Sequence, residues 1–264
     1  WVHVVSTPDT YRGGVTVADL AAEVGHVIGA AASGGRPIAA FFAESLLSCG
    51  GQIPLPDGYL AAAFEHVRAA GGVCIADEVQ VGFGRVGDAM WGFELQGVVP
   101  DIVVMGKPIG NGHPLGAVVC TREVAEAFDS GMEFFSTFGG NPVSAAVGMA
   151  VLDVIELESL QGRAAELGAR FIAGLEDLRG RHAIIGDVRG RGLFLGVELV
   201  RDHETLEPAA DEASAIVNAM KHRGVLLATD GPLHNVIKIK PPMVLSEDDV
   251  DMALREFDNV LGTC

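Results

Sequence analysis

Two short apolar runs, each followed at once by a polar residue, constrain the fold of this chain more than any other feature. Residues 73–76 precede Asp77, and residues 102–105 lead through a glycine to Lys107. Such runs, when they alternate with longer helical patterns, are typical of parallel strands covered on both faces by helices. Open α/β sheets bind ligands outside the carboxyl ends of their strands. The pattern therefore predicts an α/β sheet with Asp77 and Lys107 facing one crevice.

The remaining periodicity predicts a large domain followed by a smaller one. Further strands are expected over residues 2–5, 37–42 and 115–120, and helices over residues 57–70, 122–128, 142–157 and 160–179. From about residue 184 the pattern changes to amphipathic strands, over 193–200 and 236–239, mixed with helices over 211–223 and 247–261. We predict a large domain with a mainly parallel sheet over residues 1–180 and a small C-terminal α+β domain over residues 181–264.

Charge narrows the range of partners. The 264 residues include 35 acidic and 18 basic side chains, which gives a formal net charge of -17. A chain of this charge repels phosphate backbones and anionic lipid surfaces. We therefore expect neither nucleic-acid nor membrane partners.

Cysteine spacing and hydropathy bear on the compartment. Cys49, Cys74, Cys120 and Cys264 lie far apart and without metal-ligand spacing, so we expect reduced thiols, no disulfide framework and no metal site. No apolar run approaches the roughly 20 residues that span a bilayer, and the first residues lack a signal-peptide pattern. The sequence thus predicts a cytoplasmic location.

The two polar strand ends match what pyridoxal 5'-phosphate (PLP) demands of a protein. That cofactor needs an amine, a carboxylate for its pyridine nitrogen and donors for its phosphate. Lys107, one of four lysines, is expected to be partly desolvated, which favours the free amine. Asp77 at a buried strand end needs a partner, and a protonated pyridine is one. On these residues alone, a solvated loop lysine and a helix-capping or ion-paired aspartate remain open.

Longer motifs carry a resemblance to a known family. Residues 75–80, Ile-Ala-Asp-Glu-Val-Gln, and residues 82–85, Gly-Phe-Gly-Arg, resemble the cofactor block of the class III aminotransferases. The resemblance continues in the family's order and spacing over nearly the whole chain, through residues 100–103, 106–107, 135–142 and 186–190. It implies the PLP-dependent transferase fold, fold type I.

The resemblance also implies roles for individual residues. Asp77 would pair with the pyridine nitrogen, Val79 would pack on a ring face, and Gln80 would bond near the ring hydroxyl. Lys107 would form the Schiff base with the cofactor. Thr137 would bind the cofactor phosphate of a neighbouring subunit, which implies a homodimer with shared active sites.

Within the family, the chain more closely resembles the phospho-lyases that act on phosphoethanolamine or phosphohydroxylysine. Residues 8–13, 48–52, 81–87 and 106–108 carry this likeness. Lys238 stands where many class III transaminases have an Arg for the substrate carboxylate, and Glu44 stands where the family has a strand-end Glu near the site. An Arg clamps a carboxylate with two parallel hydrogen bonds, whereas a Lys is a flexible point charge. A small primary amine that carries phosphate is therefore expected as substrate.

Two questions stay open at this stage. Lys107 would remove a substrate proton in both reactions, so transamination and β-elimination of phosphate are both compatible with these residues. A non-catalytic PLP-fold interaction module is the alternative, although Asp77, Gln80, Lys107 and Thr137 argue against it. Family members also carry a further stretch before the region that matches Trp1, so we expect a piece of a longer enzyme that by itself binds PLP weakly or not at all and is inactive.

Overall fold

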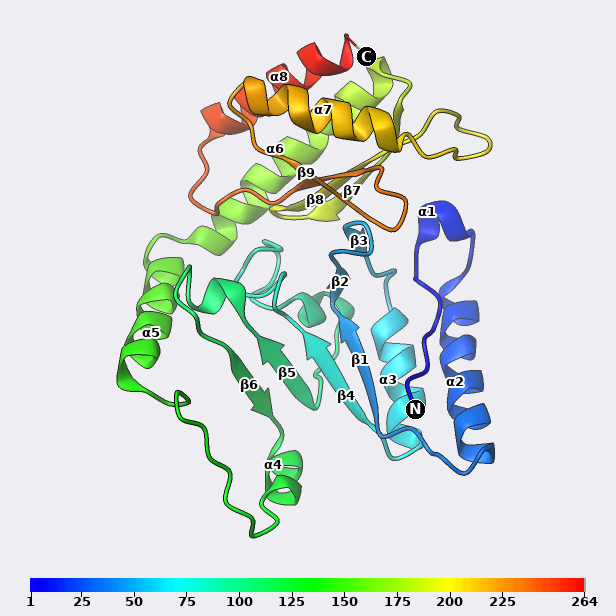
Figure 1. The fold of residues 1–264 in the computed structure, drawn as a ribbon, viewed down its shortest axis with the longest axis vertical. Helices are drawn as coiled ribbons and strands as arrows, with labels where there is room; N and C mark the ends of the chain where they lie inside the picture. The colour runs from blue at the N-terminus through cyan, green and yellow to red at the C-terminus, as the bar shows by residue number, and fades with distance from the viewer. Residues whose placement is uncertain (264) are drawn as a thin grey trace.

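The computed structural model describes residues 1–263, which form two four-stranded sheets, each with its own helices (Figure 1). The strands of the first sheet follow the order β1 (Ala40–Glu44), β4 (Val73–Asp77), β5 (Ile102–Met105) and β6 (Ala117–Cys120). The first three are parallel, and β6 pairs antiparallel with β5. The prediction of a mainly parallel α/β sheet is thus confirmed, with β6 as its one antiparallel strand.

Two helices cover the first sheet beside β1 and β4. They are α2 (Val17–Ser33) and α3 (Tyr59–Ala69), and their apolar faces form one core with the strands. Thr16 and Asp19 cap the start of α2 reciprocally, each side chain bonding the other's backbone N–H. At the far edge, α4 (Arg122–Phe128) and α5 (Pro142–Leu157) follow β6. The shorter elements are α1 (Thr10–Gly13), β2 (Leu46–Leu47), β3 (Ile53–Pro54), η1 (Gly92–Gln96) and η2 (Lys107–Ile109).

The second sheet is antiparallel and lies between its own helices and the first sheet (Figure 1). Its strands follow the order β7 (Ile185–Arg191), β8 (Phe194–Leu199), β10 (Val236–Ile239) and β9 (Ala228–Asp230). Its core includes residues of the helices α6 (Leu160–Arg181), α7 (Ala210–His222) and α8 (Glu247–Leu261). The α6 helix thus packs with the second sheet, while the division at residues 180 and 181 stays a prediction.

The isoleucine and lysine side chains in and directly after β10 point to opposite faces of the second sheet. Ile237 and Ile239 lie in the core beneath the helices. Because successive side chains of a strand point to opposite faces, Lys238 and the following Lys240 face the other way, toward the first sheet. The fold therefore directs two lysines at the carboxyl ends of β1 and β4.

Most predicted elements are confirmed, and several expectations are wrong. The elements expected over residues 102–105, 122–128, 142–157, 236–239 and 247–261 have the predicted bounds. Residues 2–5 form no strand, and the helix α2 was not predicted. The strand β8 is buried at every position instead of amphipathic, because its other face packs against the first half of the chain. No helix within residues 1–263 combines the length and the apolar character needed to cross a bilayer.

Candidate active site

Three of the predicted site residues meet at one edge of the first sheet. Glu44 and Asp77 are the last residues of β1 and β4, and the parallel register sets them side by side. Asp77 is also paired with Val104 of β5, whose chain continues through Gly106 into η2, where Lys107 is the first residue. The structure therefore brings an acid pair and the candidate lysine to the carboxyl ends of adjacent parallel strands.

Asp77 is held in place by its own chain. Its Oδ1 atom accepts a hydrogen bond of 2.9 Å from the backbone N–H of Val79, which leaves Oδ2 facing no donor among the described residues. A β-carbon at Gly106 would lie 3.4 Å from both methyl carbons of Val79. The glycine therefore lets the Val79 side chain lie close against the backbone that leads into Lys107.

Lys107 is exposed and has a left-handed backbone, with φ of 35°. Non-glycine residues in this conformation cost free energy and are frequent at functional sites. Within residues 1–263 its amine makes no hydrogen bond or ion pair. The partial desolvation that we expected of it is not seen, because the described residues leave this side chain exposed.

Gln80 joins the end of β4 to the loop that follows β1. Its amide nitrogen donates to Ser48 Oγ over 2.8 Å. Ser48 in turn donates to the Glu44 carboxylate twice, from Oγ at 2.5 Å and from its backbone N–H at 2.6 Å. Glu44 therefore has a structural role in ordering this loop, beside the substrate role that the resemblance implies.

Lys240 is the site residue that the sequence analysis missed. Its ammonium donates a hydrogen bond of 2.9 Å to Gln80 Oε1 and lies 4.2 Å from the centre of the Phe194 ring. Alternating apolar and lysine residues over 236–240 were a signal that both lysines share one face. Two neutral groups thus hold this cation against the end of β4.

The electrostatic surroundings of Lys240 weaken its hold on the proton. Burial, and then the nearby charge of Lys238, lower its pKa to about 8, while the carboxylates of Asp230 and Glu44 and the side chain of Cys49 oppose the shift. Near neutral pH the amine is still mostly protonated. Lys240 is therefore a cation in a partly dry setting, where an anion is attracted more strongly than in water.

Lys238, predicted from the resemblance to contact substrate, has a carboxylate partner. Its ammonium lies 3.0 Å from Asp230 Oδ2. The same oxygen accepts a hydrogen bond of 2.7 Å from Gln52, whose side chain is fully buried and also donates to the Ser48 carbonyl. Gln52 has a left-handed backbone as well, with φ of 56°. Asp230 and Gln52 are thus further members of the cluster that sequence reasoning missed.

Thr137 is not brought to the other predicted site residues. It lies exposed in the loop between α4 and α5, which runs away from the ends of β4 and β5 (Figure 1). The same segment exposes the large apolar side chains of Met132, Phe134, Phe135 and Phe138. Gathered exposed apolar side chains mark interaction surfaces. This location is compatible with a role for Thr137 at another subunit.

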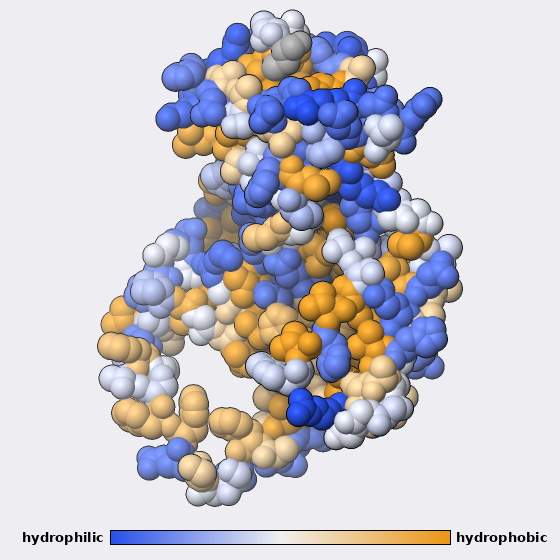
Figure 2. Space-filling view, turned by 45° about the vertical axis from the view of Figure 1, so that its right-hand side comes forward, coloured by the Kyte–Doolittle hydropathy of each residue, from blue (hydrophilic) through white to orange (hydrophobic). Residues whose placement is uncertain are grey.

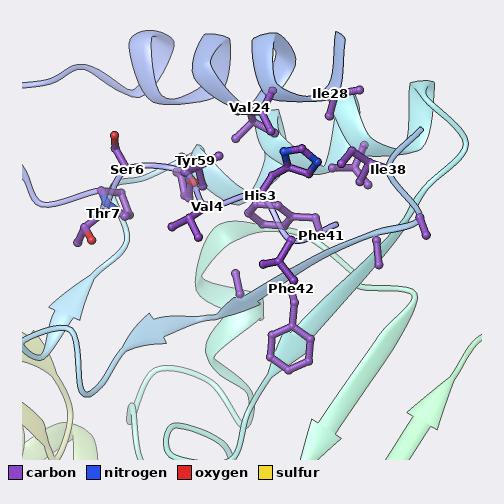
Figure 3. Close-up of a pocket in the computed structure, with 18 of the residues that line it drawn as sticks. His3, Val4, Ser6, Thr7, Val24, Ile28, Ile38, Phe41, Phe42 and Tyr59 are labelled. Carbon is purple, nitrogen blue, oxygen red and sulfur yellow. The ribbon is translucent and has the colours of Figure 1, made fainter. Parts of the chain in front are cut away.

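A large hollow lies to one side of this polar cluster. It measures about 810 Å³, is mainly apolar, and is lined by residues 1–8, the helix α2 and the strand β1. Figure 3 shows His3, Val24, Phe41 and Tyr59 around it, and Figure 2 shows apolar residues gathered on the half of the molecule that holds the first sheet. The hollow reaches Glu44 but not Asp77 or Lys107. Its lining contains no lysine, the side chain that would attach PLP.

The fold and the polar strand ends define an α/β protein with a lysine and an aspartate at one sheet edge. The sequence profile of the class-III aminotransferases matches residues 4–261, so the chain belongs to that family. It is 50% identical to a Drosophila melanogaster protein described as alanine–glyoxylate aminotransferase 2-like, over 99% of this chain and 55% of that protein. It is 40% identical to the Caenorhabditis elegans ethanolamine-phosphate phospho-lyase homolog 1, over 99% of this chain and 60% of that protein. The chain thus spans little more than half the length of these curated relatives.

Solved structures show the same fold. An Arthrobacter phospholyase in complex with phosphoethanolamine matches with a TM-score of 0.95 and 38% identity, over 99% of this chain and 63% of that chain. A Bacillus anthracis aminotransferase matches with a TM-score of 0.91 and 35% identity, over 98% and 61%. An amine transaminase from an uncultivated Pseudomonas species, described as PLP-bound, matches with 0.87 and 33%, over 98% and 61%. The predicted fold type I is confirmed.

The described residues fit the ring of PLP by the chemistry of their donor set. Asp77 has a carboxylate oxygen without a donor, Lys107 has an amine without a partner among residues 1–263, and Gln80 supplies an amide beside them. Val79 supplies an apolar side chain at the same strand end. Of the predicted residues, only the distant Thr137 is suited to the phosphate end of the cofactor.

Proposed function

We propose that the chain carries the active site of a PLP-dependent enzyme that acts on a small primary amine and eliminates phosphate from it. The observation that most strongly supports this proposal is that Asp77 and Lys107 lie at one sheet edge, toward which Lys238 and Lys240 point from the second sheet. The structural likeness to a phospholyase in complex with phosphoethanolamine supports the choice of reaction. Phosphoethanolamine-like amines are the substrate class proposed.

Four residues of the sheet edge would hold the cofactor. Asp77 would keep the ring nitrogen protonated, Val79 would pack on a ring face, Gln80 would bond near the ring hydroxyl, and Lys107 would hold the reactive carbon. When bound, PLP supplies an electron sink for the negative charge that develops on the substrate carbon. These roles are supported by the Asp77 oxygen and the Lys107 amine, neither of which has a hydrogen-bond partner among residues 1–263.

Lys107 would also move the proton. Its amine would take the proton from the carbon that bears the substrate nitrogen, and the C–O bond to phosphate at the next carbon would break with its electron pair leaving on phosphate. With phosphoethanolamine, addition of water then gives acetaldehyde, ammonia and inorganic phosphate. The exposed position of Lys107 leaves it room to reach the substrate.

The free cation at this edge favours phosphate over an ordinary carboxylate. Lys240, which makes no ion pair within residues 1–263, supplies a point charge, whereas bidentate recognition of a carboxylate is the geometry of Arg. A second candidate is amino transfer, because relatives that are 50% and 47% identical are described as alanine–glyoxylate aminotransferase 2 proteins. The substrate, not the cofactor residues, separates the two reactions.

A homodimer in which Thr137 serves the neighbouring subunit is part of the proposal. The exposed apolar side chains of its loop support an interface there. The cytoplasm remains the predicted location. Because three relatives are described as mitochondrial, fluorescence microscopy of the tagged protein would distinguish the cytoplasm from the mitochondrion.

The reaction is tested on the protein at its full natural length, supplied with PLP. Phosphoethanolamine is added, and inorganic phosphate and acetaldehyde are measured, beside a parallel assay of amino transfer from alanine to glyoxylate. We expect equal amounts of phosphate and acetaldehyde, and none from the Lys107→Ala variant. Amino transfer without phosphate release would show that the enzyme is a transaminase and not a lyase. If neither reaction occurred, both proposed activities would be refuted.

A further inference from the structure

Lys238 of β10 and Lys240, which directly follows the strand, differ in their charge partners. Lys238 lies 3.0 Å from Asp230, whereas Lys240 makes no ion pair within residues 1–263. Both point to the same side of the sheet because they are two residues apart in the strand β10 and the residue that directly follows it. Among the described residues, one of the two cations therefore has a carboxylate partner, and the other has none.

The partner of Lys238 is fixed from two sides. Asp230 is the last residue of β9 and pairs in register with Val236 of β10. Its carboxylate also accepts a hydrogen bond of 2.7 Å from Gln52, whose fully buried side chain has little freedom to move. For Asp230 to move away from Lys238, its hydrogen bond with the buried Gln52 side chain would have to break. The charge of Lys238 is held in a preorganised pair.

The contacts of Lys240 stabilise its charge without neutralising it. Its ammonium nitrogen lies 4.2 Å from the centre of the Phe194 ring and 2.9 Å from Gln80 Oε1. Both of these partners are neutral groups. A ring face and a carbonyl oxygen are attractive to an ammonium, but only an anion cancels its charge. The hydrogen bond to Gln80 also holds the ammonium beside the end of β4, three residues after Asp77. This cation therefore stands next to the candidate cofactor residues.

We propose that Lys240, and not Lys238, binds the phosphate group of the substrate, while Asp230 and Gln52 keep Lys238 occupied. This inference rests on the proposed function and names the group that recognises its substrate. A phosphate carries more charge than a carboxylate and accepts hydrogen bonds at several oxygens, so a point charge suits it. Asp230 would act as the positioning residue that leaves one free cation rather than two.

The inference predicts a pH dependence of phosphate binding. Burial, and then the charge of Lys238, lower the pKa of the Lys240 amine to about 8, against the opposing effect of the other titratable groups that face it, which are Asp230, Glu44 and Cys49. Phosphate binding should therefore weaken as the pH rises through that value. Loss of Lys238 removes a repelling charge, so in Lys238→Gln the decline should move to higher pH.

Binding of inorganic phosphate to the PLP-loaded, full-length protein tests the inference without relying on turnover. The probe is titrated by calorimetry into the wild type and into Lys240→Gln, which keeps a hydrogen-bond donor but loses the charge. Lys240→Arg keeps the charge, and Lys238→Gln is the matched control two residues away. We expect binding to be at least about tenfold weaker in Lys240→Gln and to change less than about threefold in Lys240→Arg and Lys238→Gln.

Each outcome separates this inference from the proposed reaction. The absorbance of bound PLP shows that every variant is loaded, and Lys240→Met serves as a second neutral variant if Lys240→Gln does not fold. Equal losses in Lys240→Gln and Lys238→Gln, a larger loss in Lys238→Gln, or no phosphate binding by the wild type would overturn the inference. Phosphate binding through Lys240 without phosphate release from phosphoethanolamine would uphold the inference and refute the proposed reaction.

Discussion

The ammonium of Lys240 donates a hydrogen bond of 2.9 Å to the side-chain oxygen of Gln80. This bond connects the antiparallel sheet to the segment directly after β4, which carries the candidate acid of the site. Since Gln80 also donates to Ser48, the contact forms part of a chain of hydrogen bonds that reaches Glu44. Groups far apart in the sequence thus share one polar cluster.

The first prediction concerns the stability effect of Lys240. Its pKa of about 8 in the folded chain lies below its ordinary value, so the charged amine is disfavoured by folding at neutral pH. Because this side chain is only partly buried, solvent screens much of the effect, and Lys240→Met should stabilise the cofactor-free protein by only about 1 kcal/mol near pH 7. Urea unfolding of both proteins measures the difference.

The sign of this effect follows from proton binding. Between pH of about 8 and about 10.5 the unfolded chain binds the proton that the folded chain has released, so the wild type gains stability as pH rises. The advantage of Lys240→Met should therefore shrink toward pH of about 10.5. The exposed Lys221→Met is the matched control for the loss of a lysine side chain. A constant advantage of Lys240→Met across this range would contradict the burial of its charge.

The second prediction separates catalysis from folding at Lys107. Its side chain is exposed, and within residues 1–263 it has no partner, so Lys107→Ala should change the free energy of unfolding by less than about 0.5 kcal/mol. Phosphate release from phosphoethanolamine should fall by at least about a hundredfold, because the proton-transfer group is lost. A variant that unfolds readily, or that retains activity, would refute this role.

The third prediction concerns Glu78, the buried neighbour of Asp77. Its carboxylate accepts hydrogen bonds from the N–H groups of Gly92 and Phe93, at 2.8 and 3.0 Å, and from the Ser45 hydroxyl. Glu78→Ala leaves these buried donors without an acceptor and should cost about 2 to 4 kcal/mol of stability. Chemical denaturation measures the loss, with the exposed Glu65→Ala as control. Equal stability of the two variants would show that Glu78 is not a structural anchor.

The fourth prediction gives Asp101 a structural role at the start of β5. Its carboxylate accepts the Cys74 N–H at 2.7 Å and binds the Arg68 guanidinium at 3.1 Å. Partial burial raises the pKa of Asp101, but the Cys74 N–H and Arg68 outweigh it and hold the pKa below the ordinary 3.8. Asp101→Ala should therefore cost about 1 kcal/mol near neutral pH.

The pH profile of this effect has a defined sign. Because the folded pKa of Asp101 is lowered, its stabilisation is present above 3.8 and is lost as the pH falls through the folded value. The difference between wild type and Asp101→Ala should narrow in acid when unfolding is followed by circular dichroism. The exposed Asp57→Ala is the control. A difference that widens in acid would be inconsistent with the ion pair.

Local patterns were sufficient to predict the first sheet and the position of its polar ends. The strand β5 has its predicted bounds because an apolar run ends at a glycine that begins a tight turn. The helix α2 was overlooked because its Ala- and Gly-rich end weakens the helical pattern, although Thr16 and Asp19 form a capping box that signals its start. Elements marked by local chemistry could thus be predicted from sequence.

The polar cluster could be predicted only in part. Asp77 and Lys107 follow buried strands and could be assigned to one edge, but the partners of Lys238 depend on how β9 aligns with β10. The contact between Lys240 and Gln80 joins residues 160 positions apart. No local pattern carries such long-range information, so Asp230 and Gln52 were missed.

The most direct test of the central claim is where PLP attaches. The full-length protein is incubated with PLP, reduced with borohydride and digested, and the modified peptide is identified by mass spectrometry. Our account predicts that the cofactor is fixed to Lys107, and that Asp77→Asn greatly weakens this attachment while Lys238→Gln does not. Attachment at another lysine, or none at all, would contradict it.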